Sequence, residues 1–199
     1  DLHSFPTRRS SDLWQRLNPG DGAFYGPKID YHLEDSIGRT WQCGTIQLDF
    51  QMPEKFDMGY IGNDGAEHRP VMLHRTVLGS MERFMGILIE HYAGAFPYWL
   101  APVQVKIIQV KPDFEAYAQE VGKTLNDAGV RTERDTRDEK LGRKIRDAQM
   151  EKIPYMLVIG ARETEERSVS VRSRTLGDLG GRTLDEFKNM LAEEPNPID

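Results

Sequence analysis

Apolar and polar residues alternate in the first half of the chain in the pattern of half-buried β-strands. Residues 28–33 place Ile29 and Tyr31 on one side, and residues 40–50 form a longer run rich in Thr, Trp, Ile and Phe. Residues 36–39, Ser-Ile-Gly-Arg, supply a turn between the two runs. We therefore expect an antiparallel hairpin.

Further along, the pattern predicts a short strand at residues 71–73 and a helix that begins after Gly79. Gly94 is the expected end of that helix. The apolar positions that follow helical spacing are Met81, Phe84, Met85, Leu88 and Tyr92.

A proline-bracketed connection, FPYWLAP at residues 96–102, is the predicted domain boundary. It separates a first domain at residues 14–100 from a second at residues 101–199. Residues 1–13 show no periodicity and lack the apolar segment of a signal peptide, so we expect a non-native or disordered leader.

In the second domain, apolar runs alternate with amphipathic segments. Residues 103–110 form a continuous apolar run, typical of a strand that is buried on both faces. Thr183 and Glu186 form a capping box that opens the last helix. The order β-α-β-α-β-β-α predicts a small α/β sandwich with a mainly parallel sheet, so the fold class is α+β followed by α/β. The remaining expected elements are helices at 113–129 and 140–150, strands at 130–136, 153–160 and 168–173, and a turn at 177–181.

Composition narrows the class of protein. Apolar residues make up 38% of the 199, which is ordinary for a globular domain. No stretch reaches the eighteen or so apolar residues of a membrane helix, so we expect no membrane partner. The single cysteine, Cys43, excludes an internal disulfide and favours the cytoplasm. A net charge of −6 disfavours nucleic-acid binding, unless a local basic face exists.

The run RPVMLHRTVLGSMERF at residues 69–84 has features of a nucleotide site. Gly79 would let a flat ligand approach the backbone, and the planar guanidinium of Arg83 can stack on a purine. Taken alone, the run is more typical of a plain strand-turn-helix with a surface arginine, and His74 of a core histidine.

Two other strings change that interpretation. GAFYGPKI at residues 22–29 and WQCGTIQLDF at residues 41–50 precede the run in a specific order. Together the three strings resemble the end of the catalytic domain of class II aminoacyl-tRNA synthetases, specifically threonyl-tRNA synthetases, over residues 19–102. The resemblance implies an antiparallel-sheet catalytic domain, of which this chain carries part.

The resemblance also implies roles for individual residues. Arg83 would stack on the adenine of ATP, and Lys28 would lie near the substrate carboxylate and phosphates; both are the expected catalytic residues. Gln42 and Thr45 would line the nucleotide. Residues implied in substrate and ATP binding are Tyr25, Gln42, Cys43, Thr45, Gln47, Ser80 and Arg83, with ATP entering together with Mg²⁺.

A catalytic zinc is implied as well, with His74 as one of three protein ligands. An apolar pocket separates threonine poorly from its near-isostere valine, whereas a metal can coordinate the hydroxyl that valine lacks. The other two ligands, a cysteine and a histidine, are expected upstream, and Cys43 is not expected to bind the metal. Because two further class II motifs are also expected upstream, we expect this polypeptide alone to form no threonyl-adenylate.

The stretch at residues 131–150 carries a cluster of cations that follows the carboxyl end of a predicted parallel strand, where α/β folds tend to bind ligands. A solvated helix with internal ion pairs is the competing interpretation. The cluster consists of Arg137, Lys140, Arg143, Lys144 and Arg146.

Three strings here resemble the anticodon-binding domain shared by several class II synthetases: LAPVQV at 100–105, DEKLGRKIRDAQ at 138–149 and IPYMLVIG at 153–160. The resemblance implies that Glu163 and Arg172 read anticodon bases, and that Lys144 and Arg146 make basic contacts near the loop. Asp138 stands where many relatives carry asparagine, so two hydrogen-bond donors are lost there.

The leading interpretation is part of a threonine–tRNA ligase, which activates L-threonine with ATP and transfers it to tRNA(Thr), and which is a homodimer at full length. A second interpretation is a tRNA anticodon-binding module without catalysis. A third is a sister synthetase for histidine, proline or glycine, which the WQCGTIQLDF string and His74 disfavour.

Overall fold

The computed structural model describes residues 17–195. The chain divides into two compact units, Asp1–Met85 and Gly86–Asp199, which we describe separately. The predicted leader at residues 1–13 lies outside the described residues. Within residues 17–195, no helix combines the length and apolar character needed to cross a membrane.

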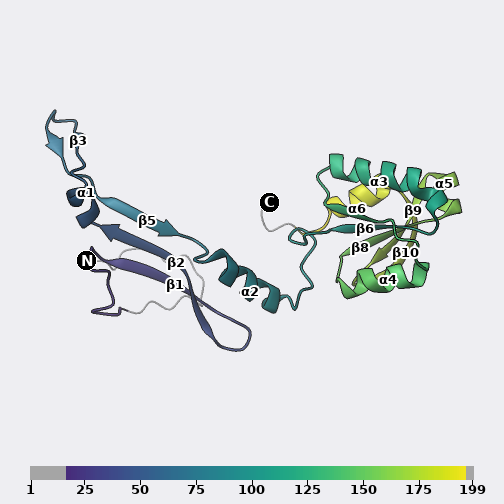
Figure 1. The fold of residues 1–199 in the computed structure, drawn as a ribbon, viewed down its shortest axis with the longest axis horizontal. Coiled ribbons are helices and arrows are strands. Elements are labelled where there is room, and N and C mark those ends of the chain that lie inside the picture. Colours follow the sequence, from purple (N-terminus) through teal and green to yellow (C-terminus); the bar gives the residue numbers. More distant parts are fainter. Residues whose placement is uncertain (1–16, 196–199) are drawn as a thin grey trace. The chain divides into compact units, whose positions relative to one another are not determined.

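The first unit is built on a three-stranded antiparallel sheet in the order β1-β2-β5 (Figure 1). Its strands are β1 (Lys28–Glu34), β2 (Thr40–Asp49) and β5 (Met72–Thr76). The predicted hairpin is confirmed, since β1 and β2 pair antiparallel. The third strand is longer than predicted because it pairs with β2 as far as Thr76, opposite Thr45.

A β-bulge interrupts the hairpin. Tyr31 pairs with Gly44 and His32 pairs with Gln42, which leaves Cys43 as the extra residue of β2. Without the bulge, Gln42 would project to the side opposite Thr45, because side chains alternate along a strand. The bulge shifts that alternation by one residue and returns Gln42 to the side of Thr45.

The sheet has one polar and one apolar face. Cross-strand partners project to the same side, so the register assigns each residue to a face. The mainly apolar face carries Ile29, Tyr31, Ile46, Leu48 and Leu73, together with Arg75 opposite Ile46. The mainly polar face carries Lys28, Asp30, His32, Gln42, Thr45, Gln47, Asp49, His74 and Thr76, together with Met72 opposite Asp49.

Three short elements lie between β2 and β5 and were not predicted: α1 (Gln51–Lys55), β3 (Tyr60–Ile61) and β4 (Glu67–His68). They are too short to produce a periodic pattern. Arg69 fixes this segment, because its Nη1 donates to the carbonyls of Pro53 at 3.1 Å and Met58 at 2.7 Å.

The expected turn and helix follow β5. Gly79 has a φ of +69°, and a Cβ at this position would lie 2.6 Å from the carbonyl oxygen of Cys43, so only glycine fits there. The helix α2 (Met81–His91) begins two residues later and ends before the predicted Gly94. None of its residues is buried.

The second unit contains a five-stranded sheet in the order β10-β9-β8-β6-β7 (Figure 1). The strand β6 pairs in parallel with β7 and β8, whereas β9 pairs antiparallel with β8 and β10. The sheet is therefore mixed and not mainly parallel, because residues that we predicted as a turn belong to β10. The strands are β6 (Val105–Gln109), β7 (Thr132–Asp135), β8 (Tyr155–Ile159), β9 (Ser168–Ser173) and β10 (Gly177–Thr183).

Helices cover both faces of this sheet. α3 (Glu115–Asp127), which follows the 3-10 turn η1 (Pro112–Phe114), packs with α6 (Leu184–Ala192) on one face, and α4 (Leu141–Met150) packs on the other (Figure 1). The short α5 (Ala161–Glu166) was not predicted. The capping box of α6 is confirmed, since the Glu186 amide donates to Thr183 Oγ1 at 3.2 Å.

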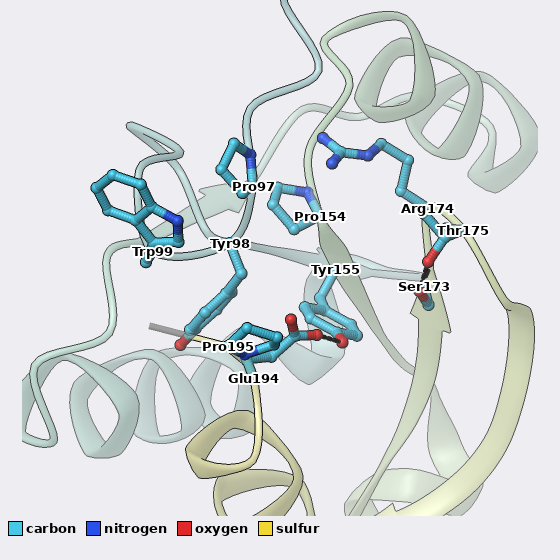
Figure 2. A pocket seen from close by; sticks show the side chains of 10 residues that line it. All are labelled: Pro97, Tyr98, Trp99, Pro154, Tyr155, Ser173, Arg174, Thr175, Glu194 and Pro195. Atoms are coloured by element: carbon cyan, nitrogen blue, oxygen red, sulfur yellow. Dashed lines mark hydrogen bonds between the residues drawn. The ribbon is translucent and has the colours of Figure 1, made fainter. Parts of the chain in front are cut away.

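The connection before β6 is fastened to the second unit. Arg174 Nη2 donates to the Phe96 carbonyl at 2.8 Å, Gln104 Nε2 to the Tyr98 carbonyl at 3.0 Å, and Arg131 Nη2 to the Trp99 carbonyl at 2.7 Å. Tyr98 and Trp99 also line a cavity of about 520 Å³ (Figure 2). The first compact unit ends at Met85, upstream of this connection. The predicted domain boundary at residue 100 remains a prediction.

Candidate functional site

Three of the predicted substrate-binding side chains and the predicted metal ligand meet on the polar face of the first unit. The Tyr25 hydroxyl donates to Gln47 Oε1, and Gln47 Nε2 donates to Thr45 Oγ1 at 3.3 Å. The Tyr25 ring meets the His74 ring edge-on, with centroids 6.0 Å apart. Gln47 lies between β1 and β5, opposite Lys28 on one side and His74 on the other. The sheet register therefore assembles this cluster from three separate segments.

A buried carboxylate, Asp49, contacts the His74 side chain of this cluster and was not predicted from the sequence. Asp49, 1% exposed, accepts a hydrogen bond from His74 Nε2 at 2.9 Å through Oδ2. Burial would raise the pKa of Asp49, but hydrogen bonds from the Met52 amide, the His74 ring and the Gln51 amide outweigh it and lower the pKa. The signal was present, because Asp49 follows Thr45 and Gln47 at strand spacing on the same face.

Lys28 lies on the same face and is paired. Its Nζ is 2.9 Å from Asp30 Oδ2 and 3.7 Å from Asp21 Oδ2. The hydrogen bond with Asp30 raises the pKa of Lys28. Lys28 therefore remains a cation at neutral pH, suited to a carboxylate or phosphate on this face.

Ser80 and Arg83 lie at the start of α2. Ser80 Oγ accepts from the Arg83 amide at 3.3 Å and donates to Glu82 Oε2 at 2.9 Å. Arg83 Nη1 donates to the carbonyl of Gln42 at 3.4 Å, a long hydrogen bond that brings the guanidinium next to the bulge. The bulge thus serves two predicted residues, because it turns Gln42 to the polar face and presents its carbonyl to Arg83.

Cys43 is the residue of β2 that the bulge leaves without a partner on β1. Its side chain is 5% exposed, so its thiol is not presented to a ligand at the surface of the described residues. Of its two neighbours, Gln42 lies on the polar face, whereas Gly44 has no side chain and pairs with Tyr31. The predicted contact of Cys43 with the substrate stays a prediction.

In the second unit, Arg172 lies opposite Met156, on the side of the sheet against which α4 packs. Its neighbours Val169 and Val171 belong to the core under α3 and α6, so Arg172 projects to the opposite side. The side chain is 35% exposed, and its Nη2 is 3.5 Å from Asp178 Oδ2 on β10. Such a partly exposed guanidinium with one loose partner can bind a polar ligand.

One of the two carboxylate oxygens of Glu163 accepts a backbone hydrogen bond. Its Oε2 accepts from the Gly160 amide at 3.0 Å and so closes the capping box of α5. The Arg162 Nε is 3.9 Å from Oε1, a weak ion-pair distance. Glu163 is held in place through one oxygen, and the other keeps acceptor capacity for a ligand.

Lys144, predicted as a basic contact near the anticodon loop, is buried in the second unit. The residue is 2% exposed, and its Nζ donates to the carbonyl of Gln109 at 3.1 Å, with the carbonyl of Asp135 at 3.5 Å. These carbonyls belong to the last residues of β6 and β7. Lys144 therefore holds two parallel strand ends together, whereas Arg146 on the same helix is exposed.

Two other residues of the predicted cation cluster, Arg137 and Arg143, form ion pairs with acidic side chains. Arg137 binds both oxygens of Asp135, at 2.9 and 2.6 Å, and Asp147 at 2.9 Å. The hydrogen bonds from Arg137 lower the pKa of Asp135, although burial acts in the opposite direction. Arg143 pairs with Glu139 at 3.1 Å. Within residues 17–195, no hydrogen bond or ion pair joins Lys144, Arg146, Glu163 and Arg172 to one another, so the structure does not unite them by contact.

Two models of known domains match the chain, one on each part. The model described as tRNA synthetase class II core domain (G, H, P, S and T) matches residues 4–92, and the model described as anticodon binding domain matches residues 104–194. The threonine–tRNA ligase of Acetivibrio thermocellus is 66% identical over 178 residues, which are 89% of this chain. The chain belongs to the threonyl-tRNA synthetase family. The threonine–tRNA ligase of Clostridium novyi is 61% identical over 182 residues.

The chain covers only part of these relatives, 28% of the A. thermocellus protein and 29% of the C. novyi protein. Among solved structures, the RNA binding domain of threonyl-tRNA synthetase from Cryptosporidium parvum matches 95% of this chain and 48% of its own, with a TM-score of 0.81 and 39% identity. Prolyl-tRNA synthetase from C. parvum, at 22% identity and a TM-score of 0.65, shares the fold alone. The predicted succession of a class II catalytic part and an anticodon-binding domain is confirmed.

Proposed function

We propose that the chain contributes part of the threonine and ATP site, together with the anticodon-binding domain, of a threonine–tRNA ligase. The reaction joins L-threonine to ATP, with Mg²⁺, and transfers the activated threonine to tRNA(Thr). The observation that carries this proposal is the polar face of the β1-β2-β5 sheet, where Tyr25, Thr45, Gln47 and His74 lie together. The relatives named threonine–tRNA ligase support the substrate assignment.

Each residue of the first unit has a role suited to its place. Arg83 and Ser80 would bind ATP at the start of α2, with Arg83 stacked on adenine and the cationic Lys28 facing the substrate carboxylate and phosphates. Gln42 and Thr45 would contact the nucleotide. Tyr25 and Gln47 would contact threonine, because their hydrogen bond fixes both polar groups in one place.

Zinc suits His74, although it needs further ligands. Residues 17–195 contain no group of three or more candidate ligand side chains, so His74 is the one ligand that we assign here. The imidazole is 44% exposed, and its Nε2 is held by the carboxylate of Asp49, a pairing that is typical of metal-bound histidines. When bound, the metal would coordinate the threonine hydroxyl and so separate threonine from valine.

In the second unit, Arg172 and Glu163 would read anticodon bases, and Arg146 would contact the backbone of the loop. Lys144 would act by position, because its ammonium is buried against the strand ends. The expected partners are therefore tRNA(Thr), ATP and L-threonine, with a homodimer as the full-length assembly and the cytoplasm as the compartment.

A second candidate function is anticodon binding alone. It is favoured by the completeness of the second unit, in which both sheet faces are covered by helices and a closed core forms. The first unit, in contrast, leaves the apolar residues Ile29, Tyr31 and Leu73 about half exposed.

Replacing Arg172 tests the anticodon assignment. We expect Arg172→Ala to weaken binding of a tRNA with a threonine anticodon about 5- to 150-fold, corresponding to ~1–3 kcal/mol for a lost base contact. The matched control is Lys188→Ala, since Lys188 lies on α6 against the opposite sheet face. Unchanged binding by the Arg172 variant, or equal losses for tRNAs with threonine and non-threonine anticodons, would show that Arg172 does not read bases.

A further inference from the structure

One hydrogen bond of the polar face fixes the chemistry of its imidazole. His74 Nε2 lies 2.9 Å from Asp49 Oδ2, and the contact joins the last residue of β2 to the middle of β5, 25 residues further along the chain. No hydrogen bond to His74 Nδ1 is present among residues 17–195. The two ring nitrogens therefore lie in different environments.

Asp49 itself is held rigidly. Its second oxygen, Oδ1, accepts from the backbone amides of Gln51 and Met52, both at 2.9 Å, at the start of α1. The carboxylate is 1% exposed, so water does not compete for these bonds. With three hydrogen bonds from three directions, the carboxylate cannot rotate without breaking the entry to α1.

A carboxylate accepts hydrogen bonds and donates none, so the proton of the neutral imidazole is placed on Nε2 and the lone pair on Nδ1. A metal binds a histidine nitrogen through that lone pair. We propose that Asp49 is a positioning residue that selects this tautomer and ring plane, so that Nδ1 is the nitrogen presented to the metal. The inference rests on the proposed role of His74 as a zinc ligand.

Asp49→Asn provides a sharp test. The two backbone amides require an oxygen at the Oδ1 position, so the new NH₂ group takes the Oδ2 position and donates towards Nε2. His74 must then accept at Nε2 and carry its proton on Nδ1. We expect the tautomer to invert in the variant, as read from ¹⁵N NMR spectra of the ring.

The chain offers a matched control. His68 Nε2 also contacts a carboxylate, that of Asp64, but both residues are exposed. Asp64→Asn should leave the His74 spectrum unchanged.

Two results would overturn the proposal. One is a wild-type His74 that carries its proton on Nδ1, and this measurement needs no variant to fold. The other is an Asp49→Asn variant that keeps the wild-type tautomer while the Gln51 and Met52 amide resonances show an intact start of α1. Neither reading requires metal, threonine or tRNA, so failure of the ligase assignment would appear separately, in assays of aminoacylation.

Discussion

Lys144 and Arg146 lie two residues apart on α4, and because Lys144 is buried whereas Arg146 is exposed, we propose opposite roles for them. Replacing Lys144 by Met keeps the length of the buried stem but removes the ammonium that binds the Gln109 carbonyl at 3.1 Å and the Asp135 carbonyl at 3.5 Å. We expect this change to cost stability and to leave RNA contacts in place, whereas Arg146→Ala should do the reverse.

The magnitude follows from the contacts. A hydrogen bond from a charged donor contributes about 1.5–3 kcal/mol, and the second contact, at the distance limit, adds little. The buried carboxylate of Asp135 keeps its bonds from Arg137, so the larger penalty of an unpaired buried charge does not apply in full. We therefore expect a loss of about 2–3 kcal/mol for Lys144→Met and less than about 0.5 kcal/mol for the exposed Arg146→Ala.

Native-state hydrogen exchange measures the loss of stability, because the slowest-exchanging amides of β6 and β8 report the free energy of unfolding of the second unit. The method does not require the whole chain to unfold in a single transition. The salt dependence of tRNA binding measures the contact term. Removing a cation that binds a single-stranded phosphate lowers the slope of log K against log salt by about 0.7. Arg146→Ala should show that reduction, and Lys144→Met should not.

A Lys144→Met variant with wild-type exchange rates and a reduced salt slope would refute the reasoning. Such a result would show that the Lys144 ammonium reaches RNA in solution and that its buried hydrogen bonds do not stabilise the fold.

Two further predictions concern the edge of the same sheet. Glu163 caps α5 through one oxygen, so Glu163→Gln should keep the hydrogen-exchange protection of α5 and lose tRNA affinity. Glu163→Ala should lose both the protection and the affinity. If both variants bind tRNA as the wild type does, Glu163 acts only as the helix cap. The pKa of Asp135 is lowered in the folded state, chiefly by Arg137, so its stabilising effect is complete above the unfolded pKa near 4 and is lost as pH falls through the folded pKa. Acid titration of stability should therefore be flatter below about pH 4 in Asp135→Asn than in the wild type, and parallel curves would contradict this assignment.

Local sequence patterns predict much of the fold. Strand alternation defined β1 and β2, helical spacing and a glycine defined α2, and the Thr183–Glu186 capping box placed the start of α6. The motif strings led to the correct family because they are long and continuous, and their identity depends on no distant contact.

The elements that the sequence analysis missed or misassigned are short or depend on partners. The six residues of α5 are too few to show a period, and β10 contains three glycines in the pattern of a turn until β9 pairs with it. That pairing, which no local pattern encodes, adds a second antiparallel pair to the one between β8 and β9.

The site shows the same division. The sequence alone determined which residue types are available: an imidazole at position 74, a guanidinium at 83 and a lysine at 144. Only the tertiary structure decided that the bulge at Cys43 turns Gln42 to the polar face, that Asp49 fixes the ring of His74, and that Lys144 is buried. The physical reason is that exposure, hydrogen-bond partner and protonation depend on segments far apart in the chain, which meet only when the strands are in register.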